Sequence, residues 1–203
     1  STPIKSSAAS DVYKRQTHKT VLFLSYKAEN WNTMDNIYKK YCQEKDIKVI
    51  VQCVPYYYKN IDGTFEKYID GGMYPEYVTI TPIEDYNYVN ENPDVIVFQY
   101  PYDNYNSAGT TDPVFYSYNL ASHTQKLIYI PYFRTDEIDE NDMRAYTNMD
   151  AYVTMPGVVY ADKVIVQSEE IRKLYIKKLT DFFGEESEDE WEDKIEAEDI
   201  GGI

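Results

Sequence analysis

The chain has 203 residues, of which 43% are hydrophobic, 27% are charged and 23 are tyrosines, and its formal net charge is −15. This length allows one full domain with an ordinary core, because domains usually span about 100–200 residues. No basic stripe could follow a phosphate backbone, which argues against nucleic acid as a partner, and no apolar run approaches the roughly 18 residues of a membrane-spanning helix.

The first sixteen residues are set apart from the rest. They show neither helical nor alternating periodicity, and their stretch SAASDVYKRQ resembles a translated sequencing adapter. Residues 1–16 are therefore expected to be a non-native or disordered leader. No positively charged start leads into an apolar segment, so no signal peptide is predicted and a cytoplasmic location is expected.

Regular patterning begins at Lys19, and residues 17–184 are predicted to form one domain. Residues 21–24 are a continuous apolar run, typical of a strand buried on both faces. Apolar and aromatic residues then recur at three- and four-residue spacing from Trp31 to Tyr41, which predicts an amphipathic helix. Residues 47–54 form a second predicted strand, and Asp62-Gly63 marks a turn inside a tyrosine-rich loop.

Three further strands are predicted, over residues 95–98, 127–130 and 163–166. We also expect a short helix at 82–86, before these strands. A weak helix at 146–152 and a loop at 155–157 are expected between the last two of them. The clearest helix follows Ser168, whose hydroxyl can accept from the first-turn amides. Strands that alternate with helices predict an α/β fold with a doubly wound, mostly parallel sheet and helices on both faces, forming a single Rossmann-like lobe.

The pattern changes beyond Gly184. Ten acidic residues and one lysine lie between Glu185 and Asp199, so much of the negative charge is local. Trp191 and Ile195 stand at helical spacing, yet residues 185–203 are expected to be an acidic tail or the truncated start of a next segment. The two cysteines, Cys42 and Cys53, are expected to be free and buried.

Candidate site residues come from the carboxyl ends of the strands, because ligands of open α/β sheets bind in the crevice beyond those ends. Residues 100–106 are the most site-like segment, since aromatic faces, one carboxylate and two amides share one loop. A turn packed for structural reasons explains this segment equally well. The rule also selects residues 56–59 and Ser168. The predicted substrate-binding residues are Tyr26, Lys27, Tyr100, Tyr102, Asp103, Asn104, Asn106, Tyr132 and Arg134.

No catalytic residue and no metal site are assigned from the sequence. His18 lies beside the adapter-like segment, and His123 has no Cys or carboxylate at ligand spacing, so neither is expected to bind a metal. A structural role is also more expected for His123 than a role as general base. No Walker-type or GxGxxG loop follows the first strand, and no cofactor is predicted. Lys27 is a candidate anion contact.

A family resemblance extends from Lys19 to Gly184, and the segments that carry it lie between Val21 and Ser168. Its segments are VLFLSYKA, PYYY, DGTF, PDVI, PYDNYN, LIYIPYF and ADKVIVQS, in matching order. They resemble the amino-terminal half of bacterial proteins grouped with the CDP-glycerol glycerophosphotransferases. The resemblance implies the acceptor-side lobe of a two-lobed, GT-B-type transferase, whose second lobe binds a CDP-activated polyol donor.

The resemblance also implies a reaction and a place in the cell. An acceptor hydroxyl would attack the β-phosphorus of the donor, CMP would leave, and a teichoic-acid-like or other polyol-phosphate or glycan acceptor would be extended. The full-length protein would associate peripherally with the inner face of the cell membrane.

Two departures from that family bear on activity. Family polymerases carry a Trp-His-Gly motif whose histidine is the expected general base, whereas residues 130–133 here are Ile-Pro-Tyr-Phe. A phenol with a pKa of about 10 is a poor base at neutral pH. The donor lobe also has no counterpart in this sequence. The chain alone is therefore expected to be inactive, and a noncatalytic ligand-binding or scaffolding α/β domain is the alternative.

Overall fold

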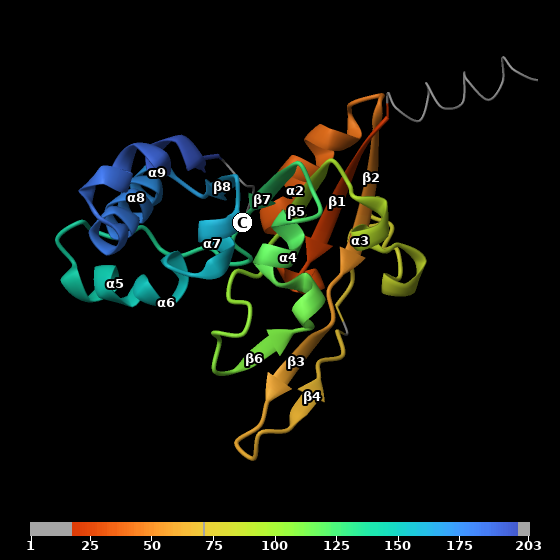
Figure 1. Cartoon of the computed structure of the whole chain (residues 1–203), viewed down its shortest axis with the longest axis horizontal. Coiled ribbons are helices and arrows are strands. Elements are labelled where there is room, and N and C mark those ends of the chain that lie inside the picture. The colour runs from red at the N-terminus through yellow and green to blue at the C-terminus, as the bar shows by residue number, and fades with distance from the viewer. Residues whose placement is uncertain (1–17, 71, 199–203) are drawn as a thin grey trace, which may run out of the picture.

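A parallel β-sheet forms the centre of the computed structural model, which describes residues 18–70 and 72–198 (Figure 1). Its six strands lie in the order β2-β1-β5-β7-β8-β9, and all neighbours run parallel. The α/β fold of the doubly wound type is therefore confirmed, while the predicted leader lies outside the described residues. The strands are β1 (Lys19–Ser25), β2 (Ile47–Cys53), β5 (Val95–Phe98), β7 (Lys126–Tyr129), β8 (Lys163–Val166) and β9 (Ile195–Ala197).

Both faces of the sheet are buried, because successive side chains of a strand point to opposite sides. In β1, Leu22 and Leu24 belong to one core, while Val21 and Phe23 belong to the other. Helix α2 covers the second face, and the other helices pack on the first. None of the described helices is long and apolar enough to cross a bilayer. The helices are α2 (Asn32–Cys42), α3 (Tyr88–Glu91), α4 (Ser117–Ala121), α5 (Met143–Asn148), α6 (Asp150–Val153), α7 (Pro156–Tyr160), α8 (Glu169–Phe183) and α9 (Glu188–Lys194).

The strand order locates the point where a ligand is expected. Ile80 forms an isolated parallel bridge with Val51 of β2, and the amide of Thr81 donates to the Val51 carbonyl at 2.7 Å. This bridge stands where the third strand of a Rossmann sheet would be. With it, the strands of the sheet numbered along the chain have the order 3-2-1-4-5-6, and β9 follows at the edge. The order reverses between β1 and β5, so the crevice beyond these two strands is the expected binding position.

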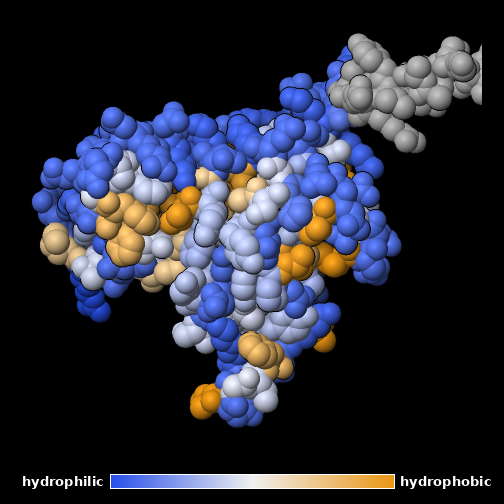
Figure 2. Space-filling model, in the orientation of Figure 1, coloured by the Kyte–Doolittle hydropathy of each residue, from blue (hydrophilic) through white to orange (hydrophobic). Residues whose placement is uncertain are grey.

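A second, antiparallel sheet extends from the body of the molecule (Figure 1). It has the order β4-β3-β6 and consists of β3 (Tyr56–Lys59), β4 (Phe65–Lys67) and β6 (Gly109–Thr111). The turn between β3 and β4 is closed by the Asn60 amide, which donates to the Thr64 carbonyl at 2.9 Å, and Gly63 adopts a φ of 83°. Ile61, at the tip of the hairpin, is exposed to solvent. Figure 2 shows hydrophobic residues at the far end of this arm of the molecule. The expected tyrosine-rich loop is thus a β-hairpin around the predicted turn.

The helices after β7 differ partly from expectation. Helix α8 is confirmed, and the Ser168 hydroxyl accepts from the Ile171 amide at 3.2 Å. The weak helix expected at 146–152 is present as two short helices, α5 and α6. Residues 155–157 were expected to be a loop, but Pro156 begins α7, because a proline fits the first turn of a helix.

The segment after Gly184 packs against the sheet. Trp191 of α9 is 3% exposed, its indole nitrogen donates to the Ser187 hydroxyl at 2.9 Å, and its ring lies 5.2 Å from that of Phe183. Strand β9 then pairs with β8, with Ile195 opposite Val164. The expected solvated tail is therefore wrong for residues 185–198. The acidic side chains lie on the outside of α9, whereas its one tryptophan fills a place in the core.

The cysteines are both free. Cys53 is half-buried at the end of β2, but Cys42 is exposed at the end of α2, contrary to the expectation that both are buried. Cys42 is the last residue of α2, and in this turn it is Tyr41 that packs against Phe23 of the sheet.

The packing of α9 predicts that Trp191→Ala lowers the free energy of unfolding by about 3–5 kcal/mol, because a large aromatic side chain leaves a cavity. Asp189→Ala, at an exposed position of the same helix, should cost less than about 1 kcal/mol. Urea unfolding of the two variants and the wild type measures the difference. Equal stabilities of all three proteins would show that α9 does not belong to the folded core.

Candidate functional site

Tyrosine rings that follow three strands meet at the carboxyl edge of the parallel sheet. Tyr26 comes after β1, Tyr100 after β5 and Tyr132 after β7. The ring centre of Tyr26 lies 5.3 Å from that of Tyr100 and 4.8 Å from that of Tyr132. The full cluster, which we call the tyrosine rim, consists of Tyr26, Tyr56, Tyr68, Tyr100, Tyr102 and Tyr132. The structure thus brings residues from the carboxyl ends of these strands to one place, as expected for a parallel sheet.

The point where the strand order reverses is held by one buried glutamine. Gln99, directly after β5, accepts through its side-chain oxygen from the Tyr26 amide at 3.0 Å. Its side-chain nitrogen donates to the Asn30 carbonyl and to the Thr33 hydroxyl, both at 2.8 Å. These bonds join the end of β5 to the loop after β1 and to the start of α2. The Tyr26 and Tyr100 rings are therefore placed on a rigid support.

Lys27 carries the positive charge of the rim. Its ammonium lies 4.3 Å from the ring centre of Tyr68, 4.9 Å from that of Tyr26, 5.5 Å from that of Tyr56 and 5.7 Å from that of Tyr58. The negative faces of aromatic rings attract a cation at such distances. We call these four rings the Lys27 cage. The cage places an ammonium at the carboxyl edge of β1, beside the point where the strand order reverses.

A hollow of about 420 Å³ opens next to the cage, at the ends of β1 and β2. Tyr26, Tyr56 and Tyr68 line it, so the rings that hold Lys27 also form its wall. Asp70 and Glu84 add two carboxylates. The Asp70 carboxylate is oriented by two amides, since it accepts from Ala28 at 2.7 Å and from Gly72 at 2.9 Å. The hollow therefore combines aromatic faces with fixed charge, as ligand sites commonly do.

The phenols of the rim are hydrogen-bonding groups and not bases. Burial raises the pKa of Tyr26, Tyr100 and Tyr102 well above the usual value for a phenol, and neighbouring phenols add to the effect. These side chains stay protonated at neutral pH. The Tyr102 and Tyr132 hydroxyls lie 3.3 Å apart, so they form a hydrogen bond with each other within the rim.

Neither histidine lies at this edge. His18 immediately precedes β1, and His123 comes shortly before β7, so both are at the amino ends of the strands. The Nδ1 atom of His123 lies 3.4 Å from the Asn92 side-chain oxygen, and its ring packs 5.8 Å from that of Tyr88. The chain has two histidines in all, so the tyrosine rim has no imidazole to act as a general base.

Asp103 was expected to contact a ligand, but its carboxylate is used within the fold. It is 6% exposed, and one oxygen accepts from the amide and hydroxyl of Ser117 at 2.9 and 2.8 Å. This pairing holds the rim loop on the start of α4. Burial raises the pKa of Asp103, and the two bonds from Ser117 oppose that shift. We therefore assign Asp103 a structural role.

Asn104 and Asn106 take part in contacts that shape the loop carrying Tyr100 and Tyr102. Their backbone carbonyls accept from the Lys59 ammonium at 3.0 and 2.8 Å, which ties the loop to β3. The Asn106 side-chain oxygen accepts from the Ala108 amide at 2.9 Å. Arg134 is exposed on the loop after Phe133. The structure thus gathers Tyr26, Lys27, Tyr100, Tyr102 and Tyr132, and it gives the two asparagines a role in shaping the loop.

The sequence alone did not identify Tyr68 as part of the site. It lies just beyond β4 and reaches the rim only because β3 and β4 fold back as a hairpin. Gly109 in β6 lets Tyr56 of the same hairpin pack closely, since a Cβ at position 109 would clash with the Tyr56 hydroxyl. The signal that could have found Tyr68 is its spacing from the turn, which places it on the same hairpin face as Tyr56 and Tyr58.

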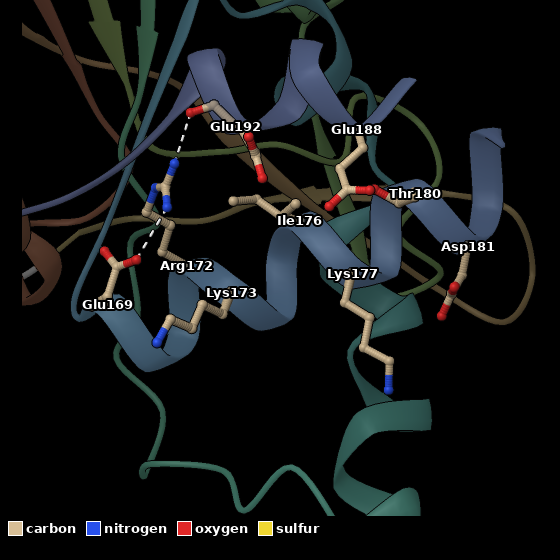
Figure 3. Close-up of a pocket in the computed structure, with 9 residues that line it drawn as sticks. All are labelled: Glu169, Arg172, Lys173, Ile176, Lys177, Thr180, Asp181, Glu188 and Glu192. Atoms are coloured by element: carbon tan, nitrogen blue, oxygen red, sulfur yellow. Dashed lines mark hydrogen bonds and ion pairs between the residues drawn. The ribbon is translucent and has the colours of Figure 1, made fainter. Parts of the chain in front are cut away.

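A second hollow lies between α8 and α9 (Figure 3). Its volume is about 380 Å³, and charges of both signs line it. Arg172 is already engaged, because it pairs with Glu169 at 3.1 Å and donates to the Glu192 carbonyl at 2.7 Å. Lys173 and Lys177 point away from α9. We interpret this groove as a seam between two helices and not as a ligand site.

Metal-ligating groups are not clustered in the part of the chain that the structure describes. No three His, Cys, Asp or Glu side chains in that part are placed to hold an ion together. The groups that the structure places at and beside the rim are aromatic ring faces, phenol hydroxyls, the Lys27 ammonium and the carboxylates of Asp70 and Glu84.

The pairing of Asp103 with Ser117 predicts a contrast between two variants. Asp103→Ala should lower the free energy of unfolding by about 1–3 kcal/mol, because the buried Ser117 donors lose their acceptor. Asp103→Asn keeps an acceptor and tolerates the φ of 51° at this position, so it should cost much less.

The same pairing predicts a pH dependence. The pKa of Asp103 is raised in the fold, so the wild type should lose stability relative to Asp103→Asn as pH rises from the ordinary aspartate value through the folded value. Thermal unfolding of both proteins over that range measures the difference. A wild type that gains stability over Asp103→Asn in that window would contradict this account.

Comparison of the chain with protein-family models, with curated proteins and with solved structures finds no match. The observations that bear on function are therefore the fold and the tyrosine rim.

Proposed function

We propose that this chain is the acceptor-side lobe of a CDP-glycerol glycerophosphotransferase-like transferase, acting on teichoic-acid-like or other cell-surface polyol-phosphate polymers. One observation carries the proposal: the tyrosine rim and Lys27 lie together at the carboxyl edge of β1 and β5, where the order of a doubly wound sheet reverses. In the proposal a second lobe, outside these 203 residues, holds the CDP-activated polyol donor, and the full protein works on the inner face of the cell membrane.

The chemistry of the rim suits a polyol phosphate. Phenols that remain protonated can donate to hydroxyl and phosphate oxygens, and their ring faces can pack against the carbon skeleton of a polyol or sugar. Lys27 supplies a cation for phosphate. No salt bridge within the described residues involves the Lys27 ammonium, whereas Lys39, Lys40, Lys163 and Lys178 each have a carboxylate partner. Its charge is therefore available to a ligand.

The lack of an imidazole at the rim favours a lobe that binds without catalysing. Transfer to an acceptor hydroxyl needs a group that can take its proton near neutral pH, and raised phenol pKa values make the rim tyrosines unsuited to this. The second lobe would have to provide the base. The same observation supports the alternative function of a noncatalytic ligand-binding or scaffolding domain.

Binding of the acceptor is tested first. Glycerol 3-phosphate titrated into the chain should shift the tyrosine ring resonances, and Lys27→Gln should weaken binding at least about tenfold, because a hydrogen bond to a charged group is lost. Lys126→Gln is the matched control, since it removes the same charge from the amino end of β7. Equal affinities of the two variants for glycerol 3-phosphate would contradict the assignment of Lys27.

Transfer is tested with the complete protein. The chain joined to its second lobe should release CMP from CDP-glycerol or a related CDP-polyol when an acceptor is present. Release that disappears in Tyr100→Leu and persists in Tyr118→Leu, at an exposed position of α4, would support the transferase proposal. No release with any acceptor would reject the transferase and retain the binding domain.

A further inference from the structure

The Lys27 cage has the composition of a site for an alkylammonium group. Four tyrosine rings surround one ammonium at 4.3 to 5.7 Å. Rings in this arrangement recognise a cation by its charge and by its alkyl surface, and quaternary ammonium ligands are bound in this way. Lys27 thus shows which chemical group the cage accepts.

The rings of the cage are fixed, whereas Lys27 is not. The Tyr26 backbone is held by Gln99, and Tyr56 is 4% exposed against Gly109. The Lys27 side chain is half-buried on a loop, and none of the hydrogen bonds within the described residues uses its ammonium. A lysine has a flexible four-carbon stem, so it can leave the cage without a change of the backbone.

The neighbouring hollow also favours a cation. Its wall includes three rings of the cage, Tyr26, Tyr56 and Tyr68. Two carboxylates, Asp70 and Glu84, line it together with one lysine, Lys67. Ring faces and carboxylates both attract an ammonium. A ligand in the hollow can therefore place a positive group against the same rings that now hold Lys27.

We propose that the Lys27 cage is a binding site for an alkylammonium group, in which Lys27 is the resident and displaceable occupant. The ligand class is a small molecule or polymer substituent that carries a quaternary or primary ammonium. When that group enters the cage, the Lys27 ammonium moves out and becomes free to pair with an anionic group of the same ligand. The cage would thus suit a zwitterion such as a choline phosphate. This inference does not depend on the proposed transferase.

Choline is the probe for the cage. Lys27→Ala should bind choline about tenfold more tightly than the wild type, because the resident cation no longer competes. Lys27→Arg keeps a cation in the cage and should show no gain. Adding Tyr68→Leu to Lys27→Ala should remove the gain, while adding Tyr160→Leu, at an exposed position of α7, should not. Isothermal titration gives the choline affinities of the wild type and the four variants.

Displacement is measured in the wild type without any substitution. Ring currents of the cage shift the ε-methylene proton resonances of Lys27, and saturating choline should return them to the positions of a solvated lysine. A gain in Lys27→Ala that needs Tyr68, together with this movement, would support the proposal. Choline affinity that is the same in all variants, or Lys27 resonances that do not move on saturation, would overturn it.

The two proposals predict opposite effects on ligand binding when Lys27 is replaced. Loss of the Lys27 charge weakens glycerol 3-phosphate binding in the acceptor proposal, but loss of the Lys27 side chain strengthens choline binding in the cage proposal. A protein that loses glycerol 3-phosphate binding without gaining choline binding therefore rejects the cage alone. The reverse result rejects the acceptor assignment alone.

Discussion

The parallel arrangement of strands that are buried on both faces is the constraint on which the site depends. Parallel neighbours all point the same way, so the segments that leave them must emerge at one edge. Here the segments after β1, β5 and β7 each carry a tyrosine within their first three residues, and the rings of these tyrosines pack together. The rim is therefore a consequence of the sheet, with Gln99 fixing the two strands at its centre.

Tyrosine gives this edge its particular chemistry. A ring can be buried by its neighbours while its hydroxyl remains a donor, and burial keeps that hydroxyl protonated. The same rings offer negative faces to a cation, which is why Lys27 can lie among them with no carboxylate partner in the described part of the chain. An edge of this kind offers phenol hydroxyls to polar groups and ring faces to a cation, and neither histidine of the chain lies at it.

Much of this architecture could be predicted from the sequence, because the strands of the sheet are local and continuous apolar runs. The buried stripe and the Ser168 cap of α8 were equally local. The second sheet was not predictable in this way, since β3 pairs with β6 far along the chain and depends on Gly109 to admit Tyr56. The packing of residues 185–198 was hard to predict for a similar reason, since β9 has only three residues and pairs with the distant β8. The strong acidity around Trp191 also obscured its packing against Phe183.

The sequence predicted where the candidate site lies, but it predicted only some of the residues that form it. Strand ends selected Tyr26, Lys27, Tyr100 and Tyr132, whereas the chemistry of Asp103 was misjudged because its partner, Ser117, lies on another element. Convergence of the rim rings is the claim that supports all the rest, and nuclear Overhauser contacts between ring protons test it most directly. With selectively labelled tyrosines, the account predicts contacts from Tyr26 to both Tyr100 and Tyr132. Absence of both contacts in the folded protein would contradict it.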